Sequence, residues 1–231
     1  MNRNTYDQFA ERYAEVFGER DETDLQGDSK VFFDLIGDVA GQHVLDAGCG
    51  EGFAARVLCS RGARVTGIDI SEPLVAMAKA RDTDGQIDYR VCDLSQPVPE
   101  LEGRFDVVVS NYVLNDVPDY KGFVQTIASA TRPGGRLVLS MNNPYSAVLR
   151  GKAESYFESG TSVLYHGMAN VGIKVYYYHR TMTEYITAFR ENGLLLRTLV
   201  DLAPQGVNSP DDPRSRWHEV PFLVVIELVK L

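Results

Sequence analysis

Short apolar runs alternate with amphipathic stretches along most of the chain. The apolar runs predict strands, and the stretches between them carry apolar residues at helical spacing. The run FDVVVSN at 105–111 is apolar at consecutive positions, as expected for a strand that is covered on both faces. A Pro-Gly-Gly turn is expected at 133–135. The runs before residue 143 are 43–47, 64–70, 87–92, 105–111 and 136–142. This alternation predicts an α/β fold with a doubly wound parallel sheet.

The alternation breaks between residues 143 and 180. This segment is rich in Tyr, Gly and Ser, and it holds one β-like run, IKVYYYH, at 173–179. A helix at 181–193, with a capping box at Thr181 and Glu184, restores the pattern. The last two apolar runs are 194–202 and 221–231. We therefore predict a single domain over 1–231 in which residues 143–180 form an inserted lid.

Residues 1–40 predict helices that precede the first strand. Near their start, Tyr6, Phe9 and Tyr13 fall on one face of an amphipathic helix. Two interpretations of this aromatic stripe stay open. It packs into the core, or it belongs to a flap that covers a ligand.

Composition narrows the classes of partner. Acidic residues number 32 against 23 basic ones, and the net charge of −9 argues against a nucleic-acid partner. The three cysteines show no zinc-binding spacing, and free thiols favour a reducing compartment. No apolar stretch approaches the ~20 residues of a membrane span. We expect a cytoplasmic protein with a small-molecule partner, no membrane or nucleic-acid contact, and a homodimer as an open alternative.

A glycine-rich turn follows the first strand. The stretch VLDAGCGEG (44–52) carries Gly48, Gly50 and Gly52 and opens a helix, where free N–H groups favour an anion. Ligands of open parallel sheets bind beyond the carboxyl ends of the strands. Asp69 ends the second strand and Asp93 follows the third, so these carboxylates can accept hydrogen bonds from ribose hydroxyls and an exocyclic amine.

These motifs resemble those of class I S-adenosylmethionine-dependent methyltransferases. The resemblance rests on VLDAGCGEG, GIDIS, CDLSQPVP, FDVVVSNYVLNDVPD and RPGGRLVLS, and it covers roughly residues 30–142. It implies a Rossmann-like seven-stranded sheet, mostly parallel with an antiparallel last strand, and S-adenosylmethionine as cofactor. The implied cofactor-binding residues are Tyr13, Asp46, Gly48, Gly50, Gly52, Asp69, Ile70, Asp93, Leu94 and Asn111. Asp46 and the glycines are implied to hold the methionine part, Asp69 the ribose, and Asp93 with Leu94 the adenine.

Three other interpretations of the motifs are weaker. An NAD site needs the spacing G-x-G-x-x-G, and this turn lacks the third glycine at that position. Metal-dependent members of the family carry acidic ligands after the fourth and fifth strands, where this chain has asparagines, so no metal is expected. The NNPY stretch at 142–145 is similar to a signature of methyltransferases that act on nucleic-acid or protein amines. It follows the fifth predicted strand, whereas that signature follows the fourth.

The acceptor side is less defined by the sequence. His179 and His166 in the 143–180 segment are the predicted catalytic residues, with Asp116 and several tyrosines as further candidates. Strand alternation puts His179 on the same face as Tyr177. Resemblance to quinone-type and natural-product enzymes implies a small, partly apolar or aromatic acceptor. O-methylation is favoured, N- and C-methylation stay open, and the rival is a non-catalytic S-adenosylmethionine-binding module.

Overall fold

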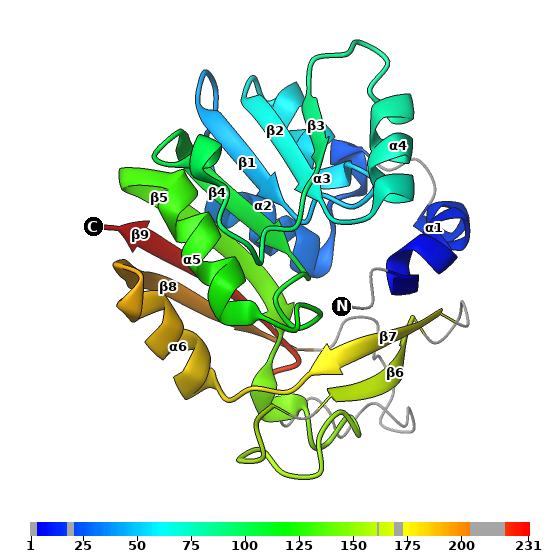
Figure 1. The fold of residues 1–231 in the computed structure, drawn as a ribbon, viewed down its shortest axis with the longest axis vertical. Coiled ribbons are helices and arrows are strands. Elements are labelled where there is room, and N and C mark those ends of the chain that lie inside the picture. The colour runs from blue at the N-terminus through cyan, green and yellow to red at the C-terminus, as the bar shows by residue number, and fades with distance from the viewer. Residues whose placement is uncertain (1–3, 18–20, 161, 169–172, 204–219) are drawn as a thin grey trace.

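The predicted strands form the central sheet of the protein (Figure 1). The computed structural model describes residues 4–17, 21–160, 162–168, 173–203 and 220–231. The strands of this sheet are β1 (His43–Ala47), β2 (Arg64–Asp69), β3 (Asp88–Val91), β4 (Phe105–Asn111), β5 (Thr131–Asn142), β8 (Leu194–Leu202) and β9 (Leu223–Lys230). Their order across the sheet is β3-β2-β1-β4-β5-β9-β8.

Pairing within the sheet is parallel from β3 to β5, and β9 pairs antiparallel with both β5 and β8. The predicted seven-stranded Rossmann-like sheet with an antiparallel last strand is therefore confirmed. β4 sends Val107 and Val109 into one apolar cluster and Val108 into the other. This burial on both faces is what the apolar run at 105–111 predicted.

Helices cover both faces of the sheet (Figure 1). α2, α3 and α4 contribute to the cluster that holds Val107, whereas α5 and α6 contribute to the cluster that holds Val108. The helices are α1 (Asn4–Phe17), α2 (Gly27–Ile36), α3 (Phe53–Ser60), α4 (Glu72–Arg81), α5 (Tyr120–Ala130) and α6 (Met182–Glu191), with short 3₁₀ turns η1 (Glu22–Asp24), η2 (Pro99–Leu101) and η3 (Pro144–Ser146). In the described part of the chain, none combines the length and apolar character that a membrane crossing requires.

Two helix starts follow their capping chemistry. Ser71 caps α4, because its hydroxyl accepts a hydrogen bond from the Leu74 N–H. The predicted capping box at α6 is confirmed: the Thr181 hydroxyl accepts from the Glu184 N–H, and the Glu184 carboxylate accepts from the Thr181 N–H at 2.8 Å. These caps fix the points at which the chain leaves the carboxyl edge of the sheet.

The turn expected at 133–135 does not separate α5 from the next strand. β5 begins at Thr131 and runs through these residues, and its register with β4 shifts between Phe105 and Val107. Gly134 supplies the positive φ of +75° at this irregularity. A glycine with positive φ serves a bulge as well as a turn, so the sequence alone did not distinguish the two.

The 143–180 segment stands apart from the main sheet. Its strands β6 (Ser162–Met168) and β7 (Ile173–Tyr178) form a separate antiparallel pair. The Tyr178 N–H donates to the Asn115 carbonyl at 2.8 Å and ties β7 to the loop after β4. In Figure 1, the β6–β7 pair and α1 lie at the edge of the sheet toward which β1, β2 and β4 point.

Candidate active site

The residues predicted to bind the cofactor converge on the carboxyl edge of the sheet. β1, β2 and β3 are adjacent and parallel, so the segments that follow them meet at one edge. The glycine turn follows β1, Asp69 ends β2, and Asp93 follows β3. Asn111 ends β4 on the other side of β1. The constellation inferred from spacing is therefore assembled in space.

Each glycine of the turn has positive φ, but their surroundings differ. A Cβ atom at Gly48 would lie 2.3 Å from the Val113 side chain, and one at Gly52 would lie 2.4 Å from the Tyr89 hydroxyl oxygen. Nothing lies within 4 Å of a Cβ atom placed at Gly50. Gly48 and Gly52 are therefore required by packing, whereas Gly50 leaves its backbone open to a ligand.

Asp69 links this turn to the start of α4. Its carboxylate accepts hydrogen bonds from the Gly50 N–H at 2.8 Å and from the Ser71 N–H at 2.9 Å. Burial raises the pKa of this carboxyl, and those backbone bonds oppose the rise. An ionised carboxylate has about four acceptor positions, so two N–H donors leave room for ribose hydroxyls.

Asp46 is the least satisfied carboxylate of the site. It is 1% exposed, and its Oδ2 atom is buried with no hydrogen-bond partner among the described residues. Burial raises its pKa to about 7, and the nearby Asp69 carboxylate adds to the rise. A buried oxygen without a donor is costly. An incoming ammonium group would supply both the donor and the opposite charge.

Glu51 anchors the turn from the other side. Its carboxylate, 2% exposed, contacts Arg81 at 2.6 Å and Arg56 at 3.0 Å, and Arg56 also donates to the Glu51 carbonyl at 2.7 Å. These arginines come from α4 and α3. We did not predict this network from the sequence. Arg81 lies 30 residues from Glu51, and no local spacing signals such a contact.

Asp93, Leu94 and Asn111 also lie where the motifs imply. The Asp93 carboxylate accepts from the Ser95 N–H at 3.0 Å and from its hydroxyl at 2.6 Å. The Leu94 side chain is buried in the core, so a ligand at this position would meet its backbone. The Asn111 amide oxygen accepts a hydrogen bond from the Ser140 hydroxyl at the end of β5.

The N-terminal helix bridges the two sides of this edge. The Ser71 hydroxyl donates to Asp7 at 2.7 Å, and the Tyr6 hydroxyl donates to Asp116 in the loop after β4. Ala10 is buried. Both interpretations of the aromatic stripe, core packing and flap, therefore have support. The Tyr13 side chain lies outside the described residues, so its predicted cofactor contact stays a prediction.

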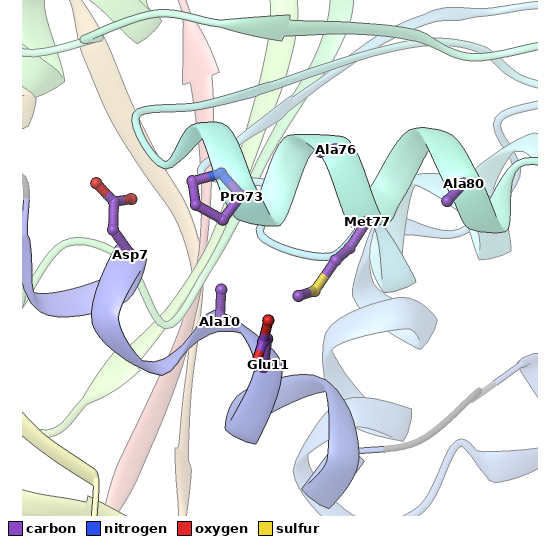
Figure 2. Close-up of a pocket in the computed structure, with 7 residues that line it drawn as sticks. All are labelled: Asp7, Ala10, Glu11, Pro73, Ala76, Met77 and Ala80. Atoms are coloured by element: carbon purple, nitrogen blue, oxygen red, sulfur yellow. The ribbon is translucent and has the colours of Figure 1, made fainter.

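A groove between α1 and α4 lies next to this edge (Figure 2). Figure 2 shows Met77 pointing from α4 toward α1, with Ala10 and Glu11 on the facing helix. The lining residues are Asp7, Ala10, Glu11, Pro73, Ala76, Met77 and Ala80. None of them is a predicted cofactor residue, so the strand-end constellation, and not this groove, is the candidate site.

The 143–180 segment supplies a buried polar and aromatic group beside β4 and β5. His179 has no exposed surface; its Nε2 lies 2.8 Å from the Tyr156 carbonyl oxygen, and its ring stacks with that of Tyr177 at 6.3 Å. The shared face predicted for these two residues is confirmed. The Lys152 ammonium lies 4.8 Å above the Tyr177 ring and donates to Asn142 at 3.0 Å.

Of the two predicted catalytic histidines, only His179 has a side chain that the structure describes. In this arrangement His179 contacts an acceptor only if the segment rearranges, so its catalytic role stays a prediction. His166 lies in β6, opposite Lys174, and its side chain is outside the described residues.

Comparisons with known proteins agree with the fold. Residues 45–139 match the family model described as a methyltransferase domain. A ubiquinone biosynthesis O-methyltransferase of Pseudomonas aeruginosa is 37% identical over 107 residues, which are 46% of this chain and 46% of that enzyme. The chain thus matches about half the length of such curated relatives.

Solved structures extend the likeness beyond the motifs. An S-adenosylmethionine-dependent methyltransferase from Listeria monocytogenes, described as putative, aligns with a TM-score of 0.72 and 23% identity over 87% of this chain and 96% of its own. Magnesium protoporphyrin IX methyltransferase from Synechocystis, solved with bound S-adenosylhomocysteine, aligns with a TM-score of 0.66 and 20% identity over 99% and 97% of the two chains. The chain therefore has the fold of these methyltransferase structures, and residues 45–139 match a methyltransferase domain.

Proposed function

We propose that this chain binds S-adenosylmethionine and transfers its methyl group to a small, partly apolar or aromatic acceptor. One observation carries the proposal: Asp46, Asp69 and Asp93 stand at the ends of three adjacent strands around an open glycine turn. The buried Asp46 oxygen that lacks a donor fits a cationic group, and the open face of Gly50 fits a closely approaching ligand. The residues present therefore suit this cofactor.

The residues of the site have distinct tasks in this mechanism. Asp46 and the glycine turn hold the methionine part, Asp69 accepts from the ribose hydroxyls, and Asp93 with the Leu94 backbone reads the adenine. When bound, the cofactor supplies an activated methyl group. The protein then has to align the acceptor for in-line attack and exclude water. The loop after β4 follows Asn111, and β7 ties the 143–180 segment, which we propose is a lid, to this loop; together they carry out that alignment.

The acceptor class rests on the curated relatives and on the aromatic residues of the lid. Those relatives are named for O-methylation in ubiquinone biosynthesis, which supports an aromatic hydroxyl as the preferred acceptor atom. Tyr156 is partly exposed and stacks with the exposed Tyr145 ring at 5.2 Å, so this part of the lid offers aromatic surface. N- and C-methylation are the alternatives.

Incubation with methyl-labelled S-adenosylmethionine and a fractionated metabolite extract tests this proposal. We expect label in a small organic product, together with formation of S-adenosylhomocysteine. A non-catalytic S-adenosylmethionine-binding module, the rival function, would bind the cofactor in calorimetry and release no labelled product from any fraction. Absence of cofactor binding would reject both functions.

Replacing Asp69 by alanine should weaken cofactor binding. The variant loses the carboxylate that we assign to the ribose, and charge-assisted hydrogen bonds contribute about 1.5–3 kcal/mol each. Calorimetry with S-adenosylhomocysteine measures the loss. Asp88→Ala, at an exposed carboxylate in β3, is the control and should bind as wild type does. Wild-type affinity in Asp69→Ala would remove Asp69 from the ribose site.

Cofactor affinity should rise with pH through neutrality. Asp46 has a pKa of about 7, so it is mostly protonated below that pH and mostly ionised above it. The ammonium group of the ligand prefers the ionised form, and affinity for S-adenosylhomocysteine should increase about tenfold between pH 6 and pH 8. Asp46→Asn should bind more weakly and lose most of this dependence. A pH profile that is the same in both proteins would show that another group titrates.

A further inference from the structure

The loop after β4 places one carboxylate on the acceptor side of the site. The proposed cofactor residues come mainly from the ends of β1, β2 and β3, and β4 and β5 continue the sheet beyond β1. The edge next to β4 and β5 is therefore left for the acceptor. Asp116 lies in the loop between β4 and α5, and its side chain is partly buried. This inference rests on the methyl-transfer function proposed above.

Four titratable or charged groups face Asp116, one from α1 and three from the 143–180 segment. Tyr6 of α1 hydrogen-bonds to its carboxylate. Lys152 of the lid and Arg180, which precedes α6, act on it as positive charges. Burial raises the pKa of the Tyr178 phenol in β7, and the nearby Asp116 charge adds to the rise. The carboxylate thus faces an arginine, a lysine and two phenols.

The Tyr6 contact shows what kind of group this carboxylate accepts. A phenol hydroxyl donates to Asp116, and it comes from α1, an element that lies across the edge of the sheet and is not part of it. An acceptor with an aromatic hydroxyl would present the same donor to the same oxygen. The geometry that holds Tyr6 therefore also suits a phenolic acceptor.

We propose that Asp116 accepts the hydroxyl proton of a phenolic acceptor, and that Tyr6 and the acceptor hydroxyl compete for this carboxylate. As the O–H bond breaks, its electron pair stays on the acceptor oxygen, which bonds to the methyl carbon. The bond between that carbon and the cofactor sulfur breaks, and its electron pair neutralises the sulfonium. Asp116 takes up the proton and afterwards releases it to water. The products are a methyl ether, a thioether and one released proton.

The electrostatics of the cluster suit this role. Burial raises the pKa of Asp116 to about 7, against the hydrogen bond from Tyr6 and the charges of Lys152 and Arg180. A carboxylate with this pKa is a stronger base than an ordinary aspartate, and about half of it is ionised at neutral pH. Burial also lowers the pKa of Lys152 to about 6, so the titrations of Asp116 and Lys152 are coupled. His179, in contrast, is held against the Tyr156 carbonyl with no exposed surface.

Acceptors that differ in acidity test the proposal. Para-cresol, with a pKa near the ~10 of tyrosine, must lose its proton during the reaction. Para-nitrophenol, similar in size, is largely ionised at mildly alkaline pH and needs no base. Asp116→Asn should reduce kcat on para-cresol by about 10²–10⁴ and on para-nitrophenol far less. With S-adenosylmethionine saturating at every pH, so that the titration of Asp46 does not affect the rate, the wild-type pH–rate profile on para-cresol should show an acidic limb near pH 7.

Two further variants complete the experiment. Tyr6→Phe should lower the KM for para-cresol, because the competing hydroxyl is gone. His179→Gln should affect both phenols equally if this residue only supports the lid. Urea unfolding establishes that each variant folds, and calorimetry with S-adenosylhomocysteine establishes that it binds cofactor. The pH–rate profile of the wild-type protein is a further test that does not depend on any variant.

Several outcomes would overturn the assignment. Equal losses on both phenols in Asp116→Asn, a selective loss in His179→Gln, or a wild-type profile without a limb near pH 7 would each remove Asp116 as the base. An unchanged or raised KM in Tyr6→Phe would reject the competition. If wild type methylates neither phenol but labels an amine from the extract, the phenolic acceptor is wrong and methyl transfer itself stands.

Discussion

Replacing Arg180 by methionine is expected to lower the free energy of unfolding by about 2–4 kcal/mol, because buried carbonyls would lose their donor. Arg180 is 4% exposed, and its guanidinium donates to three backbone carbonyls, those of Leu114, Val117 and Pro118, at 2.6–3.1 Å. It also lies 4.5 Å above the Tyr120 ring. Arg180 therefore fixes the loop that presents Asp116. Urea unfolding followed by circular dichroism measures the loss.

Two controls separate this network from the effect of charge. Arg180→Lys keeps the charge but loses the planar fork, so it should recover only part of the stability. Arg132→Met removes an exposed arginine that pairs with Asp106, and it should cost less than about 1 kcal/mol. If Arg180→Met unfolds within 1 kcal/mol of wild type, or about as easily as Arg132→Met, the carbonyl contacts do not hold the loop.

Replacing Gly52 by alanine should cost about 2–4 kcal/mol of stability, with strain and overpacking both contributing. Gly52 has a φ of +84°, and the added Cβ would lie 2.4 Å from the Tyr89 hydroxyl oxygen and 3.0 Å from the Ala78 Cβ. Because Gly52 is the N-cap of α3, its displacement should also weaken cofactor binding. Thermal or urea unfolding and calorimetry measure the two effects.

A double-mutant cycle separates clash from strain. Tyr89→Phe alone should cost little, since its hydroxyl makes only a 3.4 Å contact with the Gly52 carbonyl. In the Gly52→Ala background the same change should recover stability, because it removes the nearest clashing atom. Gly41→Ala, with a φ of +73° and nothing within 4 Å of its Cβ, reports strain alone. Strictly additive effects in the cycle would disprove the clash.

Much of the fold could be predicted because its signals are local. β1, β4 and β8 begin and end where the sequence predicted, since apolar runs mark them. The three strand-end carboxylates could be placed for the same reason: parallel strands bring their carboxyl ends together. The 133–135 irregularity was misassigned because Gly134 has the positive φ that both turns and bulges use.

The acceptor side could not be predicted in the same way. Arg180 contacts carbonyls 62 to 66 residues earlier in the chain, and Tyr6 reaches Asp116 across 110 residues. No spacing pattern in the sequence predicts either of these contacts, because both depend on how loops pack. His179 illustrates the limit: alternation placed it correctly beside Tyr177, yet only packing decided that it is fully buried.

The anchoring of the glycine turn sets a charge balance that favours turnover. Asp46, Glu51 and Asp69 bring three carboxylates to this region, and Arg56 and Arg81 bring two guanidinium groups. With Asp46 ionised, these five side chains together carry a net charge of −1. S-adenosylmethionine carries one net positive charge and neutralises it, whereas S-adenosylhomocysteine carries none. In the proposed reaction, methyl transfer would therefore remove part of the attraction that holds the cofactor, and this would favour release of S-adenosylhomocysteine.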